Sequence, residues 1–236
     1  MSSRRPHVVC HMAASIDGRV VVDGWPDSVT RAVRRQYDEV HASYESEGWI
    51  CGRVTMEPFA GGVRPEVQVA LEHQGAPRED FIAPGEHKSF AFAIDASGRL
   101  AWKSNDISGD HVVAIVSERV SDEYLAFLRT RGISYLIAGA REVDLALALE
   151  KIAQRFAVRT LMLEGGGKIN GGMLRAGLID EVSLLVAPVA DGRIDTAALF
   201  DVEGDEVSPW RLVLENVERR EGDVLWLRYR VVGSTS

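Results

Sequence analysis

The stretch that decides the fold is VRTLMLEGGGKINGGMLRAGLIDEVSLLVAP, residues 158–188. Its apolar run at 161–163 is typical of a short buried strand. The glycines 165–167 come next, and the spacing of the apolar residues after them predicts a compact helix that stops at Gly177. Alternating apolar residues over 180–188 then predict a second strand. The order strand, glycine loop, helix, strand is a unit of an α/β fold.

The three glycines predict a binding site for an anion such as a phosphate. A backbone without Cβ can approach an anion closely, and the N-terminus of the following helix directs N–H groups and a positive dipole end at the same point. Lys168, directly after the loop, could add a positive charge. The spacing is not the Rossmann fingerprint, because Asn170 stands where the third glycine of G-x-G-x-x-G would fall. A tight strand-to-helix turn that needs small residues is the alternative interpretation.

Composition limits the class of protein and its partners. The 236 residues fit one large α/β domain or two small ones, and the hydrophobic content of 46% is enough for a sizeable core. A net charge of −8 disfavours nucleic acid and anionic membranes as partners. Neither a signal-peptide core nor an apolar window of membrane-spanning length occurs. Cys10 and Cys51 lie in apolar runs and are expected to be buried, reduced thiols. These features predict a soluble, cytoplasmic protein.

The rest of the chain alternates between strand-like and helix-like segments. Strands are expected at 7–14, 48–51, 88–95, 111–116 and 134–138, and helices at about 27–44, 121–130 and 143–156. This alternation predicts a mostly parallel sheet flanked by helices.

The end of the chain differs from this alternation. Segments 210–217 and 224–232 predict an antiparallel hairpin at one edge of the sheet. We expect a single domain over 1–236, with disordered tails at 1–6 and 233–236. The segment 61–87 is left open between a lid, a contact arm and a partly helical region.

Three further motifs carry polar residues at the ends of expected elements. Gly52-Arg53-Val54-Thr55 follows a strand and suits a phosphate, although an ordinary Thr N-cap beside an exposed Arg is the alternative. Ser15-Ile16-Asp17-Gly18 reads as a turn, in which Asp17 could simply bond its own backbone. Arg31, Arg34 and Arg35 lie on one helix, either as a solvated face or with one of them reaching a phosphate.

Four segments together resemble the dihydrofolate reductase-like fold, and more closely the C-terminal reductase domain of the riboflavin-synthesis enzyme RibD. They are HMAASIDGRV at 11–20, CGRVT at 51–55, FAIDASGRL at 92–100 and LEGGGKINGGMLRAGLIDEVSLLVAPV at 163–189. They appear in the family's order and cover nearly the whole chain. The zinc motif of the RibD deaminase half does not occur in this sequence, so the chain resembles a stand-alone reductase.

The resemblance implies an NADPH-dependent oxidoreductase. Glu164, Gly165, Gly166, Gly167 and Lys168 would hold the NADPH pyrophosphate. Gly52, Arg53 and Thr55 would meet the pyrophosphate and the adenosine 2′-phosphate, with Ser97 and Arg99 beside them. Ser15, Asp17 and Gly18 match the turn at the nicotinamide and substrate end, which makes Asp17 the candidate for binding or protonating the substrate. Arg34 is the chosen candidate for a substrate phosphate.

The substrate implied by the resemblance is a ribosylaminopyrimidine phosphate of riboflavin biosynthesis, reduced at ribose C1′. Two departures from the family bear on the substrate. RibD-type reductases carry an Asp-Asp-Pro after their threonine, whereas Thr55-Met56-Glu57-Pro58 is closer to the dihydrofolate reductase pattern, which leaves room for a pterin or another heterocycle. About Thr30 stands where a classical dihydrofolate reductase has a carboxylate, which disfavours dihydrofolate itself. A nucleotide-binding module without catalysis is the alternative outside the enzymes. The resemblance also implies a homodimer, with weak support from Trp25, Trp102 and Trp210 if these are exposed. No metal is expected.

Overall fold

A computed structural model describes residues 5–64, 78–202 and 209–234 of the chain. The chain divides into two compact units, unit 1 (1–6 and 47–159) and unit 2 (7–46 and 160–236). Both combine a sheet with flanking helices, which confirms the predicted mixed α/β class. The expectation that the chain forms one domain stays a prediction.

Unit 2 contains the stretch from which the fold was predicted. Its strands follow the order β7-β1-β8-β10-β9, with bounds β1 (His7–Ala14), β7 (Thr160–Leu163), β8 (Glu181–Val186), β9 (Trp210–Arg219) and β10 (Leu225–Ser234). β7, β1 and β8 are parallel, whereas β10 and β9 form the predicted antiparallel hairpin. The hairpin turns through a short 3-10 segment, η1 (Glu221–Asp223), and β9 forms one edge of the sheet.

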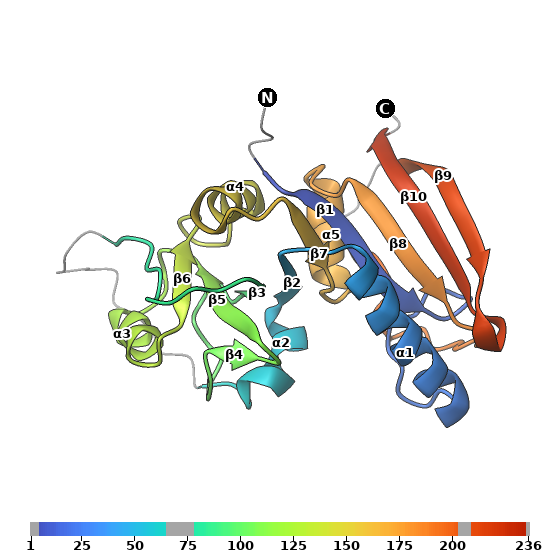
Figure 1. Ribbon diagram of the computed structural model, residues 1–236, viewed down its shortest axis with the longest axis horizontal. Helices are drawn as coiled ribbons and strands as arrows, with labels where there is room; N and C mark the ends of the chain where they lie inside the picture. The colour runs from blue at the N-terminus through green and yellow to red at the C-terminus, as the bar shows by residue number, and fades with distance from the viewer. Residues whose placement is uncertain (1–4, 65–77, 203–208, 235–236) are drawn as a thin grey trace. The chain divides into compact units, whose positions relative to one another are not determined.

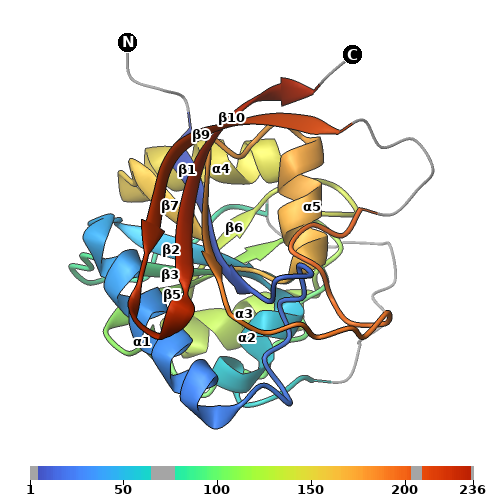
Figure 2. The ribbon, with the colours of Figure 1, turned by 90° about the vertical axis from the view of Figure 1, so that its right-hand side faces the viewer.

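Two helices cover opposite faces of this sheet, α1 (Asp27–Ser43) and α5 (Gly167–Arg175) (Figure 1, Figure 2). On the α1 side the core cluster consists of Trp25, Val33, Leu185, Ala187 and Val224. The helix α1 begins directly after Pro26, and no side chain caps its start. Asp27 is the first helical residue, where its charge complements the helix dipole.

Unit 1 holds a second, mostly parallel set of strands. They are β2 (Gly48–Gly52), β3 (Phe90–Ile94), β4 (Asp106–Ile107), β5 (Asp110–Val116) and β6 (Ser134–Ile137). β2, β3, β5 and β6 pair in parallel, and the short β4, which the sequence did not predict, pairs antiparallel with β5. The helices are α2 (Arg53–Ala60), α3 (Asp122–Thr130) and α4 (Leu145–Phe156).

Two expectations about the chain ends fail where the structure describes them. Gly233 and Ser234 continue β10 and pair with Arg211 and Trp210, so they are not a disordered tail. Pro6 is buried rather than part of a loose lead. Residues 1–4 and 235–236, and the part of the 61–87 segment at 65–77, lie outside the described residues.

The side chains offered as support for a dimer are mostly internal. Trp25 is 6% exposed and Trp102 is 1% exposed, because both fill the core of their units. Cys10 and Cys51 are buried free thiols, as predicted. Within the described residues, no helix combines the length and apolar character needed to cross a bilayer.

Candidate functional site

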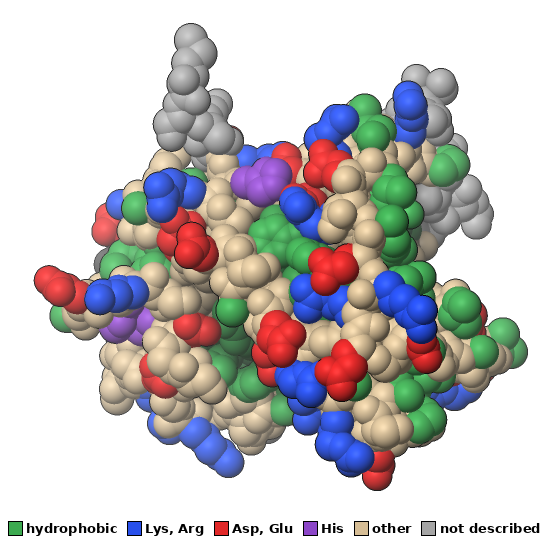
Figure 3. All heavy atoms as spheres, turned by 45° about the vertical axis from the view of Figure 1, so that its right-hand side comes forward, with side chains coloured by type: hydrophobic (Ala, Val, Ile, Leu, Met, Phe, Trp, Pro, Cys, Tyr) green, Lys and Arg blue, Asp and Glu red, His purple; other side chains and the backbone are tan. Residues whose placement is uncertain are grey.

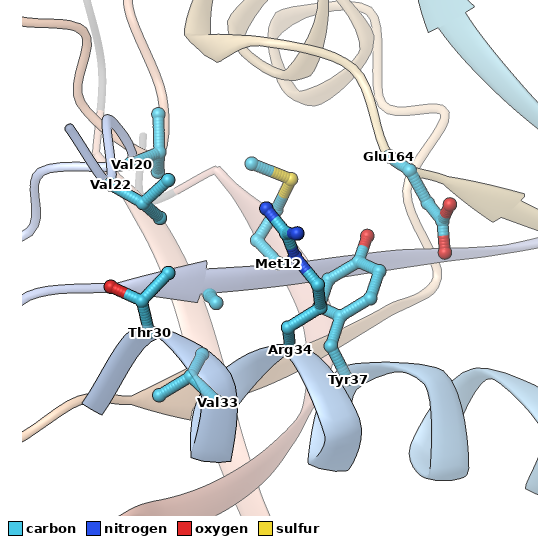
Figure 4. Close-up of a pocket in the computed structure, with 9 residues that line it drawn as sticks. Met12, Val20, Val22, Thr30, Val33, Arg34, Tyr37 and Glu164 are labelled. Carbon is cyan, nitrogen blue, oxygen red and sulfur yellow. The ribbon is translucent and has the colours of Figure 1, made fainter. Parts of the chain in front are cut away.

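Unit 2 contains a pocket between helix α1, strand β1 and the end of β7 (Figure 4). It has about 650 Å³ of open space, part of it continuous with solvent. Its apolar lining comes from Met12, Ala13, Val20, Val22 and Val33, and its polar lining from Thr30, Arg34, Tyr37 and Glu164. A mostly apolar cavity with a few convergent polar groups is the usual form of a small-molecule site.

Helix α1 places three of the polar side chains. Thr30, Arg34 and Tyr37 are four and three residues apart, so they share one face of the helix and project toward Met12 (Figure 4). Arg34 has no hydrogen bond or ion pair with any residue that the structure describes. Its guanidinium is therefore available to an anion that enters the pocket.

A buried histidine beneath the pocket fixes Tyr37. The ring of His11 on β1 stacks on Tyr37 with centroids 4.1 Å apart, and the Tyr37 hydroxyl donates to the His11 carbonyl oxygen at 3.0 Å. His11 Nε2 lies 3.1 Å from the Tyr37 carbonyl, and Nδ1 lies 3.1 Å from Ser183 Oγ. Burial lowers the pKa of His11, against an opposing effect of Glu164, so the ring is neutral. A neutral ring with Nε2–H donating satisfies both contacts.

The acidic group that lines the pocket is Glu164, at the carboxyl end of β7. Its Oε1 lies 2.6 Å from Nδ1 of His41 on α1. The side chain of Glu164 is 13% exposed and that of His41 is 31% exposed. The loop after a strand thus places a carboxylate in the pocket, and the helix supplies its partner.

Asp17 has a different environment from the one expected for a proton donor. Its carboxylate accepts hydrogen bonds from the Ser15 hydroxyl at 2.7 Å and from the backbone N–H groups of Asp191 and Gly192 at 2.9 and 2.8 Å. These bonds, led by the one from Asp191, hold the pKa of Asp17 well below its ordinary value. The side chain is exposed and does not line the pocket. An ionised carboxylate that accepts these bonds holds two loops together, so the geometry does not support Asp17 as the acid.

The loop that carries Asp191 also contacts the segment that follows the 15–18 turn. The Arg193 guanidinium bonds the Asp191 carboxylate at 2.5 Å and the carbonyl oxygen of Asp23 at 3.0 Å. Gly18, at φ +83°, provides the left-handed residue that the 15–18 turn requires. Ser15, Asp17 and Gly18 therefore shape the segment that carries the pocket residues Val20 and Val22.

The glycine loop of unit 2 joins β7 to α5, as predicted. Gly166 precedes the first turn of α5, and no side chain caps that helix. Gly167 meets a different need, because a Cβ there would lie 2.3 Å from the carbonyl oxygen of Ala198. Gly171 likewise makes room for the Asp201 backbone. The first part of the loop suits an anion, whereas Gly167 and Gly171 serve packing within the chain.

Unit 1 brings together two of the predicted motifs. β2 and β3 are parallel neighbours with Gly52 paired to Ile94, so the loops that follow them start side by side. Gly52 precedes α2, which has no side-chain cap, and Arg53 forms an ion pair with Glu57 one turn later. Thr55 lies within the first turn of α2 and is not its cap.

The loop after β3 carries the other pair, Ser97 and Arg99. The Asp95 carboxylate accepts from the backbone N–H of Arg99 at 2.7 Å, and Ser97 is exposed. Nε of Arg99 is buried without a hydrogen-bond partner among the described residues. Such an atom is costly unless a ligand or water satisfies it. Ser97 and Arg99 thus lie where an anion could be bound.

Sequence reasoning assigned Arg34 to a substrate phosphate and Glu164 to the cofactor, and both line the pocket. It proposed no site role for the other polar groups around the pocket. Thr30, Tyr37 and His41 repeat with Arg34 at helical spacing, which is the signal that could have identified them. Among the described residues, no cluster of His, Cys, Asp and Glu could hold a metal ion.

The chain belongs to the RibD C-terminal domain family, whose pattern matches residues 6–226. It is similar to a 2,5-diamino-6-ribosylamino-4(3H)-pyrimidinone 5′-phosphate reductase of Methanothermobacter thermautotrophicus, with 44% identity over 128 residues. That alignment covers 53% of this chain and 58% of the relative. A reductase of the same name from Archaeoglobus fulgidus is 23% identical over 84% of this chain and 88% of its own.

Solved structures confirm the fold. A pyrimidine reductase-like protein of Corynebacterium diphtheriae matches with a TM-score of 0.71 at 18% identity, covering 96% of this chain and 92% of that one. RibD of Acinetobacter baumannii matches with a TM-score of 0.65 at 20% identity, covering 98% of this chain and 59% of that one. At these identities the likeness concerns the fold alone.

Proposed function

We propose that this chain is an NADPH-dependent reductase of a ribosylaminopyrimidine phosphate, acting in riboflavin biosynthesis. The observation that carries the proposal is the pocket of unit 2, with an unpaired Arg34 and an acidic Glu164 on an otherwise largely apolar lining. It occurs in a chain whose family match spans nearly its whole length and whose relatives are named as reductases of such a compound.

The pocket chemistry fits this class of substrate. A guanidinium binds a phosphate through charge-assisted hydrogen bonds, so Arg34 is the proposed phosphate ligand. The apolar side chains would contact a flat heterocycle and exclude water from the reacting carbon. Thr30 and Tyr37 offer hydroxyl groups for orientation.

The residues also fit NADPH. Helices α2 and α5 both begin after a glycine without a side-chain cap, which leaves their N-termini suited to a phosphate. In unit 2, Gly165, Gly166 and Lys168 are proposed for the pyrophosphate. In unit 1, Gly52, Arg53 and Thr55 are proposed for the cofactor phosphates, and Ser97 with Arg99 for the adenosine 2′-phosphate. The cofactor, when bound, supplies a hydride.

Preference for NADPH can be tested on Arg99 alone. The Arg99→Met variant should bind NADPH about ten- to a hundredfold more weakly, because a hydrogen bond to a charged group contributes about 1.5–3 kcal/mol. Its affinity for NADH should change little. Calorimetric titration of both nucleotides measures this, with Arg119→Met as an exposed control. Equal loss of both affinities would contradict a 2′-phosphate role.

The proposed reaction converts the ribosyl group to a ribityl group. The carbon C1′ gains a hydride, the bond from C1′ to the ring oxygen breaks with its electron pair on that oxygen, and the oxygen takes one proton. We propose Glu164, in place of Asp17, as the group that holds this proton at the pocket, since Glu164 lines it and Asp17 does not.

The test offers the chain two pyrimidine substrates, the 2,5-diaminopyrimidinone and the 5-aminouracil ribosylamino phosphates, and dihydrofolate. Loss of NADPH absorbance with a product heavier by two hydrogens would identify the substrate. Arg34→Met should raise KM at least tenfold through the lost phosphate contact, and Arg31→Met on the same helix is the matched control. Reduction of dihydrofolate alone would favour the pterin alternative. Saturable NADPH binding without any oxidation would favour a non-catalytic module.

We further propose that the chain is a homodimer through one face of its C-terminal hairpin. Val217, Leu227 and Leu184 lie side by side across β9, β10 and β8, followed by Leu214, Tyr229 and Val182. On the face that Figure 3 draws, hydrophobic side chains are interspersed with charged ones. Leu214 is 51% exposed and Val217 is 56% exposed. A contiguous apolar sheet face of this kind favours burial against a second copy.

Sedimentation of wild type and Val217→Lys tests this surface. The wild type should sediment as a dimer at micromolar concentration, and the variant should dissociate because a charge cannot be buried in an apolar contact. The control is Glu215→Lys. Glu215 is exposed and lies two positions earlier on β9, but it faces the other side of the sheet, where it pairs with Arg230. A monomeric wild type would contradict the proposal.

A further inference from the structure

Helix α1 directs a row of side chains at the carboxyl edge of the sheet in unit 2. Thr30, Arg34 and Tyr37 line the pocket, and His41 follows Tyr37 by one helical turn on the same face. His41 therefore continues the row of Thr30, Arg34 and Tyr37, and it lies at the end of the pocket that Glu164 lines. Figure 4 shows the pocket members of this row facing Met12, with Glu164 beyond Tyr37.

The contact between His41 and Glu164 has the geometry of a charge-assisted hydrogen bond. Nδ1 of His41 lies 2.6 Å from Oε1 of Glu164, and the Glu164 side chain is only 13% exposed. A carboxylate withdrawn from water needs a donor, and a protonated imidazole supplies both a donor and a charge. The pair then holds one labile proton at the edge of the pocket with no net charge.

We propose that His41 is a positioning residue of the reductase site, which holds the Glu164 carboxylate in place and shares a proton with it. This inference rests on the proposed function. When His41 is protonated, the pair is neutral and can release a proton through Glu164 to the ribose ring oxygen, which leaves His41 neutral. When His41 loses its proton to solvent, the pair carries one negative charge and has no proton to release.

Other titratable groups of unit 2 near the pair do not compete in the neutral range. The pKa of the Cys10 thiol is raised by burial and then by the charge of Glu164, so it stays protonated. The pKa of His11 is lowered by burial, with Glu164 opposing and His41 adding a further lowering effect, so it stays neutral. Arg34 remains charged throughout. Cys10 and His11 therefore keep one charge state near neutrality.

The first experiment is the pH profile of kcat/KM with the identified pyrimidine substrate. In the wild type, kcat/KM should fall about tenfold per pH unit once the pair loses its proton. His41→Gln should lower kcat about a hundredfold and remove this limb of the profile. His7→Gln is the matched control, because His7 also lies near carboxylates of unit 2, 3.7 Å from Asp180, but does not line the pocket. It should keep the wild-type profile.

If the pH profile of kcat/KM in His41→Gln still falls as it does in the wild type, the inference is overturned and the proposed function stays intact. If even the wild type reduces no pyrimidine, the proposed function fails, and a second measurement decides the pair. The imidazole signal of His41 is followed by NMR titration in wild type and in Glu164→Gln without any ligand. A lower midpoint in the variant supports a shared proton, and an unchanged midpoint overturns it.

Discussion

A buried ion pair in unit 2 gives the sharpest energetic prediction. Glu181, at the start of β8, is 7% exposed. Nε of Arg228 donates to its Oε1 at 2.8 Å and a terminal guanidinium nitrogen donates to Oε2 at 3.1 Å. The Tyr44 hydroxyl also donates to Oε1. Both carboxylate oxygens are thus satisfied, by donors from β10 and from the residue that follows α1.

Arg228→Met would remove two of these donors and leave the Glu181 charge buried. Breaking one side of a buried pair costs about 3–5 kcal/mol. Because Tyr44 still donates and Arg228 is itself 32% exposed, we expect the lower end, about 3 kcal/mol. Arg230, two residues later on β10, pairs with Glu215 in an exposed position, 56% and 36% accessible. Arg230→Met should therefore cost less than about 1 kcal/mol.

Urea unfolding at pH 7 measures both variants. Arg228→Met should lower the midpoint with an unchanged m value, and adding Glu181→Gln to it should recover part of the loss by removing the uncompensated charge. If Arg228→Met and Arg230→Met have the same urea midpoint, this reasoning is refuted. Equal midpoints would show that burial of Glu181 does not increase the free energy lost with its partner.

Three further predictions follow from the same unit. Burial alone would raise the pKa of Glu181, but hydrogen bonds from His7, Arg228 and Tyr44 outweigh it and lower the pKa from 4.5 to about 2. The ionised group therefore stabilises the fold above about pH 4.5, and this stability is lost as the pH falls toward 2. When urea unfolding is repeated at stepwise lower pH, the midpoint should drop more steeply in the wild type than in Glu181→Gln. Asp17→Asn should keep kcat within about threefold of wild type, whereas a loss of about a hundredfold would restore Asp17 as a catalytic residue. Gly167→Ala should destabilise the protein by about 1–3 kcal/mol in urea unfolding, because its Cβ would lie 2.3 Å from the Ala198 carbonyl oxygen, and an unchanged midpoint would show that this segment adjusts freely.

The elements were largely predictable because local patterns determine them. The β7 strand, the glycine loop, α5 and the hairpin all follow from apolar periodicity and glycine placement in the stretch at 158–188. The helix α1 begins at Asp27, as predicted, although no side chain caps it. The two-residue β4 is too short for any periodic signal.

The site was predictable only in part, because its residues meet through the sheet rather than through sequence spacing. Glu164 follows a strand and Arg34 belongs to a helix more than a hundred residues earlier, yet both line one pocket. Asp17 was favoured as the acid because its turn matched the family. What the sequence could not show is that the backbone N–H groups of Asp191 and Gly192 occupy its carboxylate. A turn aspartate and a catalytic aspartate differ in such long-range partners.

The pocket also explains how an acidic chain could bind an anionic substrate. The net charge of −8 is a property of the whole surface, and the field inside a cavity depends on the few charges that line it. There, the Glu164 charge is matched by His41 when that histidine is protonated, which leaves Arg34 as an uncompensated cation. A phosphate monoester that enters the pocket then pairs with this cation. Loss of the His41 proton would return the lining to neutrality before any ligand entered and weaken the attraction for phosphate. The same proton would thus govern both binding and reduction, and KM and kcat should change over one range of pH.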